Sequence, residues 1–397
     1  MVAMARSTAG LVLLLGALSA LTPASIDMYL PSFPALGRAL DASPAAVQLT
    51  LSAYLIGLGV GQALYGPLAD RFGRRQPLAA GLSVYALASI GCALAPTIHA
   101  LIALRFVQAI AGSACLVIPR AIVRDLFEPQ ESARIFSLLM LVVGVAPILA
   151  PVAGSQIASA AGWRAIFALL ALLGIAGVAA TLVALPETRP RSARSGGSGI
   201  ADYGRVLSDR RALGFILGGG LAMGGLFAYI SGSPFVLIEH YGLSARAYGL
   251  VFGSIAAGLI AASQWNRRLL ARYPSRDILT VALVLNVVLG VGLVLVGSTG
   301  FGGLPALIVF LLLFISTLGL IQPNAIACAL ADHPERAASA SALYGVVQFG
   351  VASAASALVG ALHDDTPRSM TAVMAISGVG ALAMYRWLVK PGPPRRL

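Results

Sequence analysis

The sequence contains few charged side chains, and this shortage excludes most classes of soluble protein. Only 11% of its 397 residues are Asp, Glu, Lys or Arg, whereas soluble domains carry about 25% of these residues. Hydrophobic residues make up 58% of the chain, and its mean hydropathy is +0.88. A soluble globule of this length could not bury so much apolar surface, so the composition predicts an integral membrane protein.

Residues that build common catalytic and metal sites are also scarce. The three cysteines, Cys92, Cys115 and Cys328, each fall inside an apolar run, which indicates small buried side chains and not a disulfide or a metal set. The sequence has no phosphate-binding loop of the Walker type, and no zinc-binding or catalytic-triad pattern at the predicted membrane surface. We therefore expect no metal, no cofactor, no enzymatic activity and no use of ATP.

About twelve apolar runs are long enough to cross a bilayer, since a spanning helix needs about 20 apolar residues. The runs cover residues 9–36, 48–68, 77–95, 100–120, 134–160, 164–185, 213–238, 245–265, 277–298, 304–330, 338–362 and 370–389. The first run follows Arg6 and resembles a signal peptide, but it continues past Pro23 and is predicted to be a retained helix. The pattern predicts an all-α integral membrane protein embedded in a lipid bilayer.

The cations of the chain lie mainly in alternate connections between these runs. The cation-rich set consists of Arg6, Arg71, Arg74, Arg75, Arg124, Arg134, the stretch from Arg189 to Arg211, Arg267, Arg268, Arg272, Arg276, Arg336, Lys390, Arg395 and Arg396. By the positive-inside rule, this pattern places both termini in the cytoplasm. The net charge of +12 is thus explained by topology. We expect no nucleic-acid partner, because aromatic-rich basic patches are missing.

The longest connection, residues 186–211, carries a Ser- and Gly-rich polar segment that is typical of a flexible linker. It divides the chain into an N-terminal six-helix half at residues 1–188, a basic cytoplasmic linker at 189–211 and a C-terminal six-helix half at 212–397. Transporters built from two parallel repeats have this layout, and their substrate site lies where the repeats meet, near the membrane midplane.

The first connection of the N-terminal half combines glycines with both signs of charge. Its residues of interest are Gly66, Asp70, Arg71, Gly73, Arg74 and Arg75. We expect the glycines to permit a tight turn and the charges to pair with helix ends and with each other. Asp125, near the cytoplasmic end of the fourth span, could pair with this loop as a latch, or it could be a solvated surface charge.

This loop resembles, almost position for position, the cytoplasmic-loop signature of the major facilitator superfamily. The resemblance implies the major-facilitator fold, with twelve transmembrane helices in two six-helix halves. It also implies that the loop is a conformational switch and that the protein is usually a monomer. Arg105 and Gln108 resemble the fourth-helix motif of the superfamily, although Ala109 stands where a glycine is usual.

Four small or kinking residues in the fifth run form a second motif. Gly144, Pro147, Pro151 and Gly154 resemble the "antiporter" motif of drug:proton antiporters with twelve spans. Small residues let helices approach closely and prolines kink them, so generic membrane-helix packing is the alternative interpretation. Gly249 and Gly253 on the eighth run are a matching small pair.

A narrower resemblance covers most of the N-terminal half. The segments that carry it are Ser25–Pro31, Gln48–Ser52, Gly61–Pro67 and Arg124–Asp125, with weaker matches at Ser231–Phe235 and Pro323–Ala325. Together they resemble the Bcr/CflA family of bicyclomycin and chloramphenicol exporters. This implies export of amphipathic drugs across a bacterial inner membrane, driven by the proton gradient. A carrier for a metabolite such as an amino acid, or an uncoupled channel or scaffold, stays open as an alternative.

Asp27 and Arg105 are the clearest opposite charges within apolar stretches, where an unpaired charge costs several kcal/mol. At 1.5 Å per residue, Asp27 lies about 13 Å and Arg105 about 8 Å below the outer ends of their spans. A carboxyl group removed from water holds its proton more firmly, and a nearby cation opposes this. We predict that Asp27 carries the proton and that Arg105 modulates it. A turn-forming acid and a bracing arginine are the structural alternatives.

The superfamily resemblance implies a central cavity between the helices, and aromatic and small polar residues on the helices that line it are the candidates for contact with a drug. They are Tyr29, Tyr54, Gln108, Phe227, Tyr229, Phe235, Asn324, Tyr344, Gln348 and Phe349. Aromatic faces bind flat or cationic drugs and a few polar groups orient them, with helix packing as the alternative for each residue. Glu239 and the pair Asp364–Asp365 are predicted to lie at the outer surface. Arg120 either snorkels or lines the inner cavity.

Overall fold

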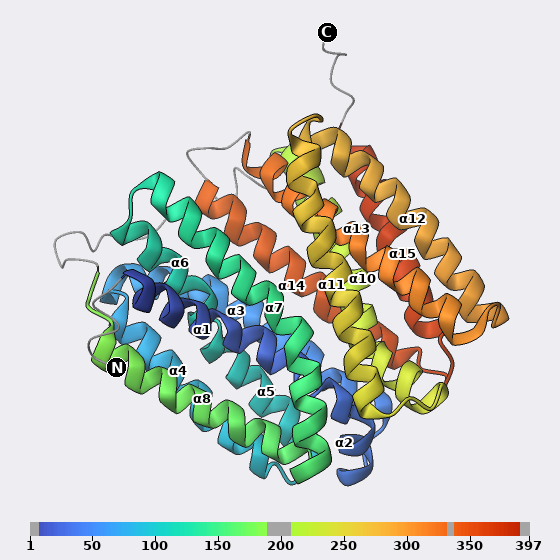
Figure 1. Ribbon diagram of the computed structural model, residues 1–397, viewed down its shortest axis with the longest axis horizontal. Helices are drawn as coiled ribbons and strands as arrows, with labels where there is room; N and C mark the ends of the chain where they lie inside the picture. The colour runs from blue at the N-terminus through green and yellow to red at the C-terminus, as the bar shows by residue number, and fades with distance from the viewer. Residues whose placement is uncertain (1–7, 189–207, 332–336, 390–397) are drawn as a thin grey trace, which may run out of the picture. The chain divides into compact units, whose positions relative to one another are not determined.

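The computed structural model describes residues 8–188, 208–331 and 337–389 (Figure 1). All regular elements in this part of the chain are helices, and twelve helical segments are long and apolar enough to cross a membrane. The predicted all-α membrane fold is therefore confirmed. Most of the linker at 189–211 lies outside the described residues. So do several cations on which the predicted orientation depends, namely Arg6, Arg336, Lys390, Arg395 and Arg396.

Several of the spans consist of two or three consecutive helical segments. The first six spans are α1 (Thr8–Asp27) with η2 (Leu30–Ser32) and α2 (Phe33–Ala39), α3 (Pro44–Phe72), α4 (Arg75–Leu94), α5 (Ile98–Gly112) with α6 (Ala114–Leu126), α7 (Pro129–Ala161) and α8 (Trp163–Ala184). The other six are α10 (Arg210–Pro234) with the π-helical η4 (Phe235–His240), α11 (Ala245–Leu270), α12 (Ser275–Thr299), α13 (Gly303–Ala331), α14 (Ala337–Ala361) and α15 (Arg368–Leu388).

Each predicted run overlaps one of these spans, but some helices begin earlier than hydrophobicity indicates. Helix α3 begins at Pro44, behind the N-cap Ser43, whose hydroxyl accepts a hydrogen bond from the Ala46 amide at 3.3 Å. Helix α5 begins at Ile98, behind Thr97, which accepts from the Ala100 amide at 3.3 Å. A capping hydroxyl satisfies an amide that the first helical turn leaves free. The helices therefore start at the cap, a few residues before the apolar run.

Span 1 is interrupted near its outer end, although the sequence reads as one apolar run. Helix α1 ends at Asp27, two residues follow without helical structure, and the chain resumes in η2 at Leu30. Pro31 lacks the backbone N–H that a continuous helix would need, which favours a break just before it. The break places Asp27 at a helix end and exposes backbone groups to neighbouring helices.

Packing divides the chain into two compact units. Unit 1 holds residues 1–197, 230–256 and 356–366, and unit 2 holds residues 198–229, 257–355 and 367–397. Unit 1 thus combines α1 to α8 with the end of α10, η4, the first part of α11, the end of α14 and the turn that follows α14. These units follow packing and not the order of the chain, so the division into halves at 188 and 212 stays a prediction.

The core of unit 1 is built from helices that meet along leucine and isoleucine rows. Leu15 and Leu18 of α1, Leu82 of α4, Ile118 of α6 and Leu139 of α7 belong to one buried cluster. Lipid tails are as apolar as leucine, so this cluster is stabilised mainly by close van der Waals packing. Tight packing between α1 and its neighbours fixes the position of the broken segment that follows it.

Candidate functional site

Asp27 is buried, and its carboxyl group is unpaired within the part of the chain that the structure describes. Its side chain is only 3% exposed at the end of α1. Among the described residues, none forms a hydrogen bond or an ion pair with it. Tyr248 of α11, in the same unit, lies close enough to interact with it electrostatically, and the hydroxyl of Tyr248 is 3.1 Å from that of Ser233. A buried, unpaired acid is costly unless it takes up a proton.

Arg105 lies at the centre of a buried cluster formed by four helices. Its guanidinium donates to the Gln108 side-chain oxygen at 2.6 Å and to the backbone carbonyl of Ser25 at 2.9 Å. The Tyr54 and Tyr29 rings lie over it at 4.0 and 4.3 Å. Gln108 in turn donates to the Ser89 hydroxyl of α4 at 2.7 Å. Cation–π contacts and hydrogen bonds to the oxygens of Gln108 and Ser25 thus stabilise the buried charge.

The structure changes the predicted relation between Asp27 and Arg105. No ion pair joins the two residues in the described part of the chain, so Arg105 is not the direct counter-charge that was expected. Arg105 instead binds the carbonyl of Ser25, two residues before Asp27 on the last turn of α1. It holds the backbone that carries the acid. The modulating role of Arg105 stays a prediction, with backbone positioning as its physical route.

Three predicted drug contacts belong to the Arg105 cluster. Tyr29, Tyr54 and Gln108 all have side chains with no exposed surface. Tyr29 also lies 3.3 Å, through its hydroxyl, from the hydroxyl of Thr50 on α3. Contact with a drug would require this cluster to open, so their role in drug binding stays a prediction.

The other predicted drug contacts are divided between unit 1 and unit 2. Phe235 lies in unit 1, where its ring packs against Phe33 at 6.0 Å. In unit 2, Tyr344 donates to the side-chain oxygen of Gln322, and Gln322 donates to the Gly219 carbonyl at 2.9 Å. Asn324 donates to Asn266 at 2.7 Å. Phe227 and Tyr229 are buried, while Gln348 and Phe349 are partly exposed. The candidates thus belong partly to unit 1 and partly to unit 2, and their role in drug binding stays a prediction.

The antiporter-like motif packs directly against the break in span 1. A Cβ atom on Gly154 of α7 would lie 1.8 Å from the carbonyl oxygen of Met28, the residue after Asp27. Helix α7 also packs closely against α11, where a Cβ on Gly249 or Gly253 would lie 3.2 or 3.1 Å from the Pro151 or Ile148 carbonyl. Helix α7 thus contacts both the break after Asp27 and α11, all within unit 1. Pro147 and Gly144 lie further along α7 and are not fully buried.

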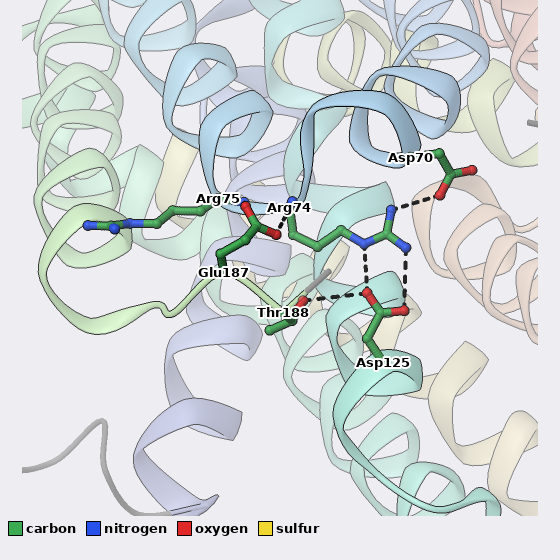
Figure 2. Close-up of polar contacts among 6 residues, drawn as sticks. All are labelled: Asp70, Arg74, Arg75, Asp125, Glu187 and Thr188. Carbon is green, nitrogen blue, oxygen red and sulfur yellow. Dashed lines mark hydrogen bonds and ion pairs between the residues drawn. The ribbon is translucent and has the colours of Figure 1, made fainter. Parts of the chain in front are cut away.

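The loop between α3 and α4, which the sequence predicts to be cytoplasmic, forms a charged network around Arg74, as Figure 2 shows. The Arg74 side chain, 1% exposed, donates to Asp125 at 2.7 Å and to Asp70 at 2.9 Å. Its backbone N–H donates to the Glu187 carboxylate at 2.8 Å. Burial lowers the pKa of Arg74, but hydrogen bonds and charges from Asp125 and Asp70 outweigh this, so its pKa lies above the usual value. Arg74 therefore stays charged and bridges α3 and α6.

This network settles one alternative and corrects one expectation. Asp125 pairs with the loop and is not merely a solvated charge, and its partner is Arg74. Gly73 has a φ of 89°, a backbone conformation that favours glycine, so it forms the predicted turn. Gly66 does not, because α3 continues to Phe72 and Gly66 lies inside it. Arg71 lies beside the Phe72 ring, 5.3 Å from its centroid, and Arg75 donates to the Leu182 carbonyl.

Sequence reasoning missed Glu187, which completes the network from the end of span 6. Its two carboxylate oxygens accept from the backbone N–H groups of Arg74 and Arg75 at 2.8 and 3.3 Å. These amides open α4, where a negative charge is favoured by the helix dipole. An isolated acid after a span was the only signal in the sequence, and its partners lie more than a hundred residues away.

The network yields a prediction about Asp70→Asn. We expect the variant to transport about tenfold more slowly than the parent, because it loses a charge-assisted hydrogen bond worth about 1.5–3 kcal/mol. Drug affinity of the purified protein should be nearly unchanged, since the loop lies far from the midplane. Transport rates in proteoliposomes and equilibrium drug binding measure the two effects. Asp41→Asn, at an exposed outer turn, is the matched control. A loss of affinity as large as the loss of rate would contradict a switching role.

At the end of unit 1 that the sequence predicts to face outward, acids interact with a cation and with histidines. Glu239 forms an exposed ion pair with Arg38 at 3.6 Å, which contributes little because solvent screens it. The His240 ring lies 2.8 Å from the backbone oxygen of Asp365, and the His363 ring 3.0 Å from its carboxylate. Asp364 accepts from Thr366 within the same turn. Asp364 and Asp365 thus stabilise the turn between α14 and α15 in which they lie.

Comparison with known proteins gives the wider context of this site. A family model described as Major Facilitator Superfamily matches residues 15–357. An uncharacterized MFS-type transporter, YdgK, of Bacillus subtilis is 38% identical over 94% of each chain. A bicyclomycin resistance protein homolog of Haemophilus influenzae is 31% identical over 96% of this chain and 97% of its own. A chloramphenicol resistance protein of Pseudomonas aeruginosa is 32% identical over 70% and 66%, respectively.

Solved structures give the same fold at low sequence identity. The crystal structure of a D-xylose-proton symporter covers 95% of this chain and 97% of its own with a TM-score of 0.75 at 15% identity. That of the nucleoside transporter NupG covers 95% and 98% with a TM-score of 0.75 at 16% identity. At these identities the likeness concerns the fold alone.

Proposed function

Because the chain belongs to the Major Facilitator Superfamily, we propose that it is a proton-coupled exporter of amphipathic drugs of the bicyclomycin or phenicol type. The superfamily makes it a small-molecule transporter and not an enzyme, and its twelve spans make it a multi-pass membrane protein. The proposal adds the substrate class, the proton coupling and the inner membrane of a bacterium as its location. Relatives named for bicyclomycin and chloramphenicol resistance support the substrate class.

The buried carboxyl of Asp27 is the observation on which proton coupling rests. It lies in a membrane span, at a helix break, with no described residue to compensate its charge. Such a group favours its neutral, protonated form, and a change in its surroundings releases the proton. Coupling requires only that drug binding and protonation favour different states of the same element.

The break after Asp27 is a suitable element for this coupling. Arg105 binds the carbonyl before it, at Ser25, and Gly154 packs on the carbonyl after it, at Met28. A movement of α5 or α7 would therefore change the position and the solvation of the acid. In this proposal a drug that reaches the Arg105 cluster displaces the Arg105 side chain from the Ser25 carbonyl. The backbone that carries Asp27 then moves, and the affinity of Asp27 for its proton falls.

A carrier for a metabolite such as an amino acid is the second candidate. The same residues would couple protons to such a substrate, and only the ligand differs. A resistance panel in a host that lacks its own pumps, repeated with a protonophore, tests the first proposal. Protonophore-sensitive resistance to a phenicol or to bicyclomycin supports it. No resistance, together with counterflow of a labelled amino acid in proteoliposomes, would replace it with the second.

Orientation gives a further prediction. We expect both termini in the cytoplasm, because the cations of the sequence lie in alternate connections. A fluorescent protein that folds only in the cytoplasm, fused after Leu397, should be bright. An alkaline phosphatase fusion at the same site, active only in the periplasm, should be inactive. The same two reporters inserted after Asp41, in the connection between spans 1 and 2, are the control and should give the opposite result. An active phosphatase at the C-terminus would reject the orientation.

A further inference from the structure

Arg120 is a cation within a membrane span that the mechanism above does not use. It lies on α6, six residues before the helix ends at Leu126, which is about 9 Å along the axis. Its side chain is exposed, and no described residue forms a hydrogen bond, an ion pair or a ring contact with it. An arginine in this position is costly unless it faces water or a charged partner.

The direction of α6 argues against escape of the side chain to the cytoplasmic surface. In the orientation predicted from the cations, the C-terminal end of α6 is the cytoplasmic end, because Asp125 there pairs with Arg74 of the loop between α3 and α4. Side chains on a helix tilt toward its N-terminus, which here is the membrane interior. The guanidinium of Arg120 is therefore carried toward the midplane and away from the cytoplasmic surface.

The surface around Arg120 also differs from a lipid-facing surface. Helix α6 buries Cys115, Ile118 and Ile122 against its neighbours in unit 1. Among the large hydrophobic residues of α6, only Leu126 at its end is exposed. Helices α4, α7 and α8, by contrast, expose large hydrophobic residues along much of their length, such as Leu87, Leu141 and Leu172. Leu116 and Val117, one turn before Arg120, are half-buried. The face of α6 that carries Arg120 and Arg124, called the open face below, therefore exposes charge and little large apolar surface.

Arg124 lies one turn further along the same helix and is exposed as well. Like charges four residues apart repel each other, by a few tenths of a kcal/mol. The acid next to Arg124, Asp125, is held by Arg74, and Glu128 lies beyond the helix end. Glu128 and Glu131 line one hollow with Arg124, so acids lie close to Arg124. Arg120, one turn deeper, has no acid paired with it among the described residues, and it lies between the cytoplasmic surface and the midplane, where carriers of this superfamily bind their substrates.

We propose that Arg120 is an anion-recognition residue for the transported compound, and that the open face of α6 selects substrates bearing a carboxylate over substrates bearing a cation. The guanidinium offers a planar pair of donors that matches a carboxylate and also accepts a carbonyl or nitro oxygen. Neutral drugs then bind with an affinity between that of carboxylates and that of cations. This inference rests on the proposed transport function, because it assigns part of the substrate class to the same path.

Three congeners of one scaffold test the charge preference. Chloramphenicol is neutral, its hemisuccinate ester carries a carboxylate, and its amine, obtained by removing the dichloroacetyl group, is cationic at neutral pH. We expect the purified full-length protein to bind the hemisuccinate about tenfold more tightly than the amine, as one charge-assisted hydrogen bond allows. Arg120→Gln should reduce this ratio to about one and Arg120→Lys should restore part of it. Arg272→Gln, at an exposed turn with the same change in net charge, should keep it. An unchanged ratio in Arg120→Gln overturns the inference.

A second measurement tests the position of Arg120 without any drug. In a background in which Cys92, Cys115 and Cys328 are replaced by Ala, Arg120→Cys should react with a membrane-impermeant thiol reagent added to the cytoplasmic side. Ile118→Cys, on the buried face, should not react. Absence of labelling at position 120 would place the residue against lipid and overturn the inference. If none of the congeners binds, the phenicol proposal fails, and this labelling still decides whether Arg120 faces water.

Discussion

Asp27→Asn is expected to abolish proton release on drug addition and to abolish resistance, while the protein still folds. An amide has almost the same shape as a carboxyl group but cannot titrate, so only the proton-carrying step is removed. The side chain makes no hydrogen bond or ion pair with any described residue, so few contacts are lost. Proton release from purified protein in weakly buffered detergent measures the effect, together with the affinity for a neutral drug, which should change little.

Two variants serve as controls for this result. Asp27→Glu keeps an acid near the break and should retain part of the proton release. Asp41→Asn makes the same chemical change at an exposed outer turn and should behave as the parent. If Asp27→Asn still releases protons and still confers resistance, the coupling acid lies elsewhere. Asp125 and Glu239 would then be the next acids to replace.

Gly154→Ala is expected to abolish transport and to lower the stability of the protein. Its new Cβ atom would lie 1.8 Å from the Met28 carbonyl oxygen, far inside van der Waals contact, so α7 and the break in span 1 must move apart. Overpacking of this kind typically costs about 1–3 kcal/mol. The shift would also displace Asp27, the residue before Met28. Thermal unfolding in detergent and transport in proteoliposomes measure the two effects.

A matched control separates the effect of the clash at Gly154 from the effect of replacing any glycine within a helix. Gly350 lies inside α14, and a Cβ atom there meets nothing within 4 Å. Gly350→Ala should therefore be neutral or slightly stabilising, because alanine favours the helix. Equal loss of transport in both variants would show that helix flexibility, and not the contact with Met28, is what transport needs. Full activity of Gly154→Ala would remove the link between α7 and the break.

The sequence by itself determined the membrane class, the twelve spans and the location of the charged loop. Hydrophobic runs, cations and glycines are local signals, and the bilayer fixes the length that each span must have. Asp27 and Arg105 could also be found from the sequence, because a charge in an apolar run is visible without any knowledge of its neighbours. A turn at Asp27, before Pro31, was kept only as an alternative, and the inclusion of Gly66 in a helix was not found. Pro31 follows a break whereas Pro67 lies inside α3, so the surrounding packing decides how each proline is accommodated.

Only the tertiary structure decided which groups meet. Arg105 binds a carbonyl 80 residues away, Arg74 binds a carboxylate 51 residues away, and the Arg74 amide binds one 113 residues away. Hydropathy places residues at a depth in the membrane, but partners at equal depth are selected by the rotation of each helix and the approach of its neighbours. Gly154 meets Met28, and Arg120 remains exposed, for this same reason: helix rotation is set by packing over the whole unit, which no local stretch of sequence contains.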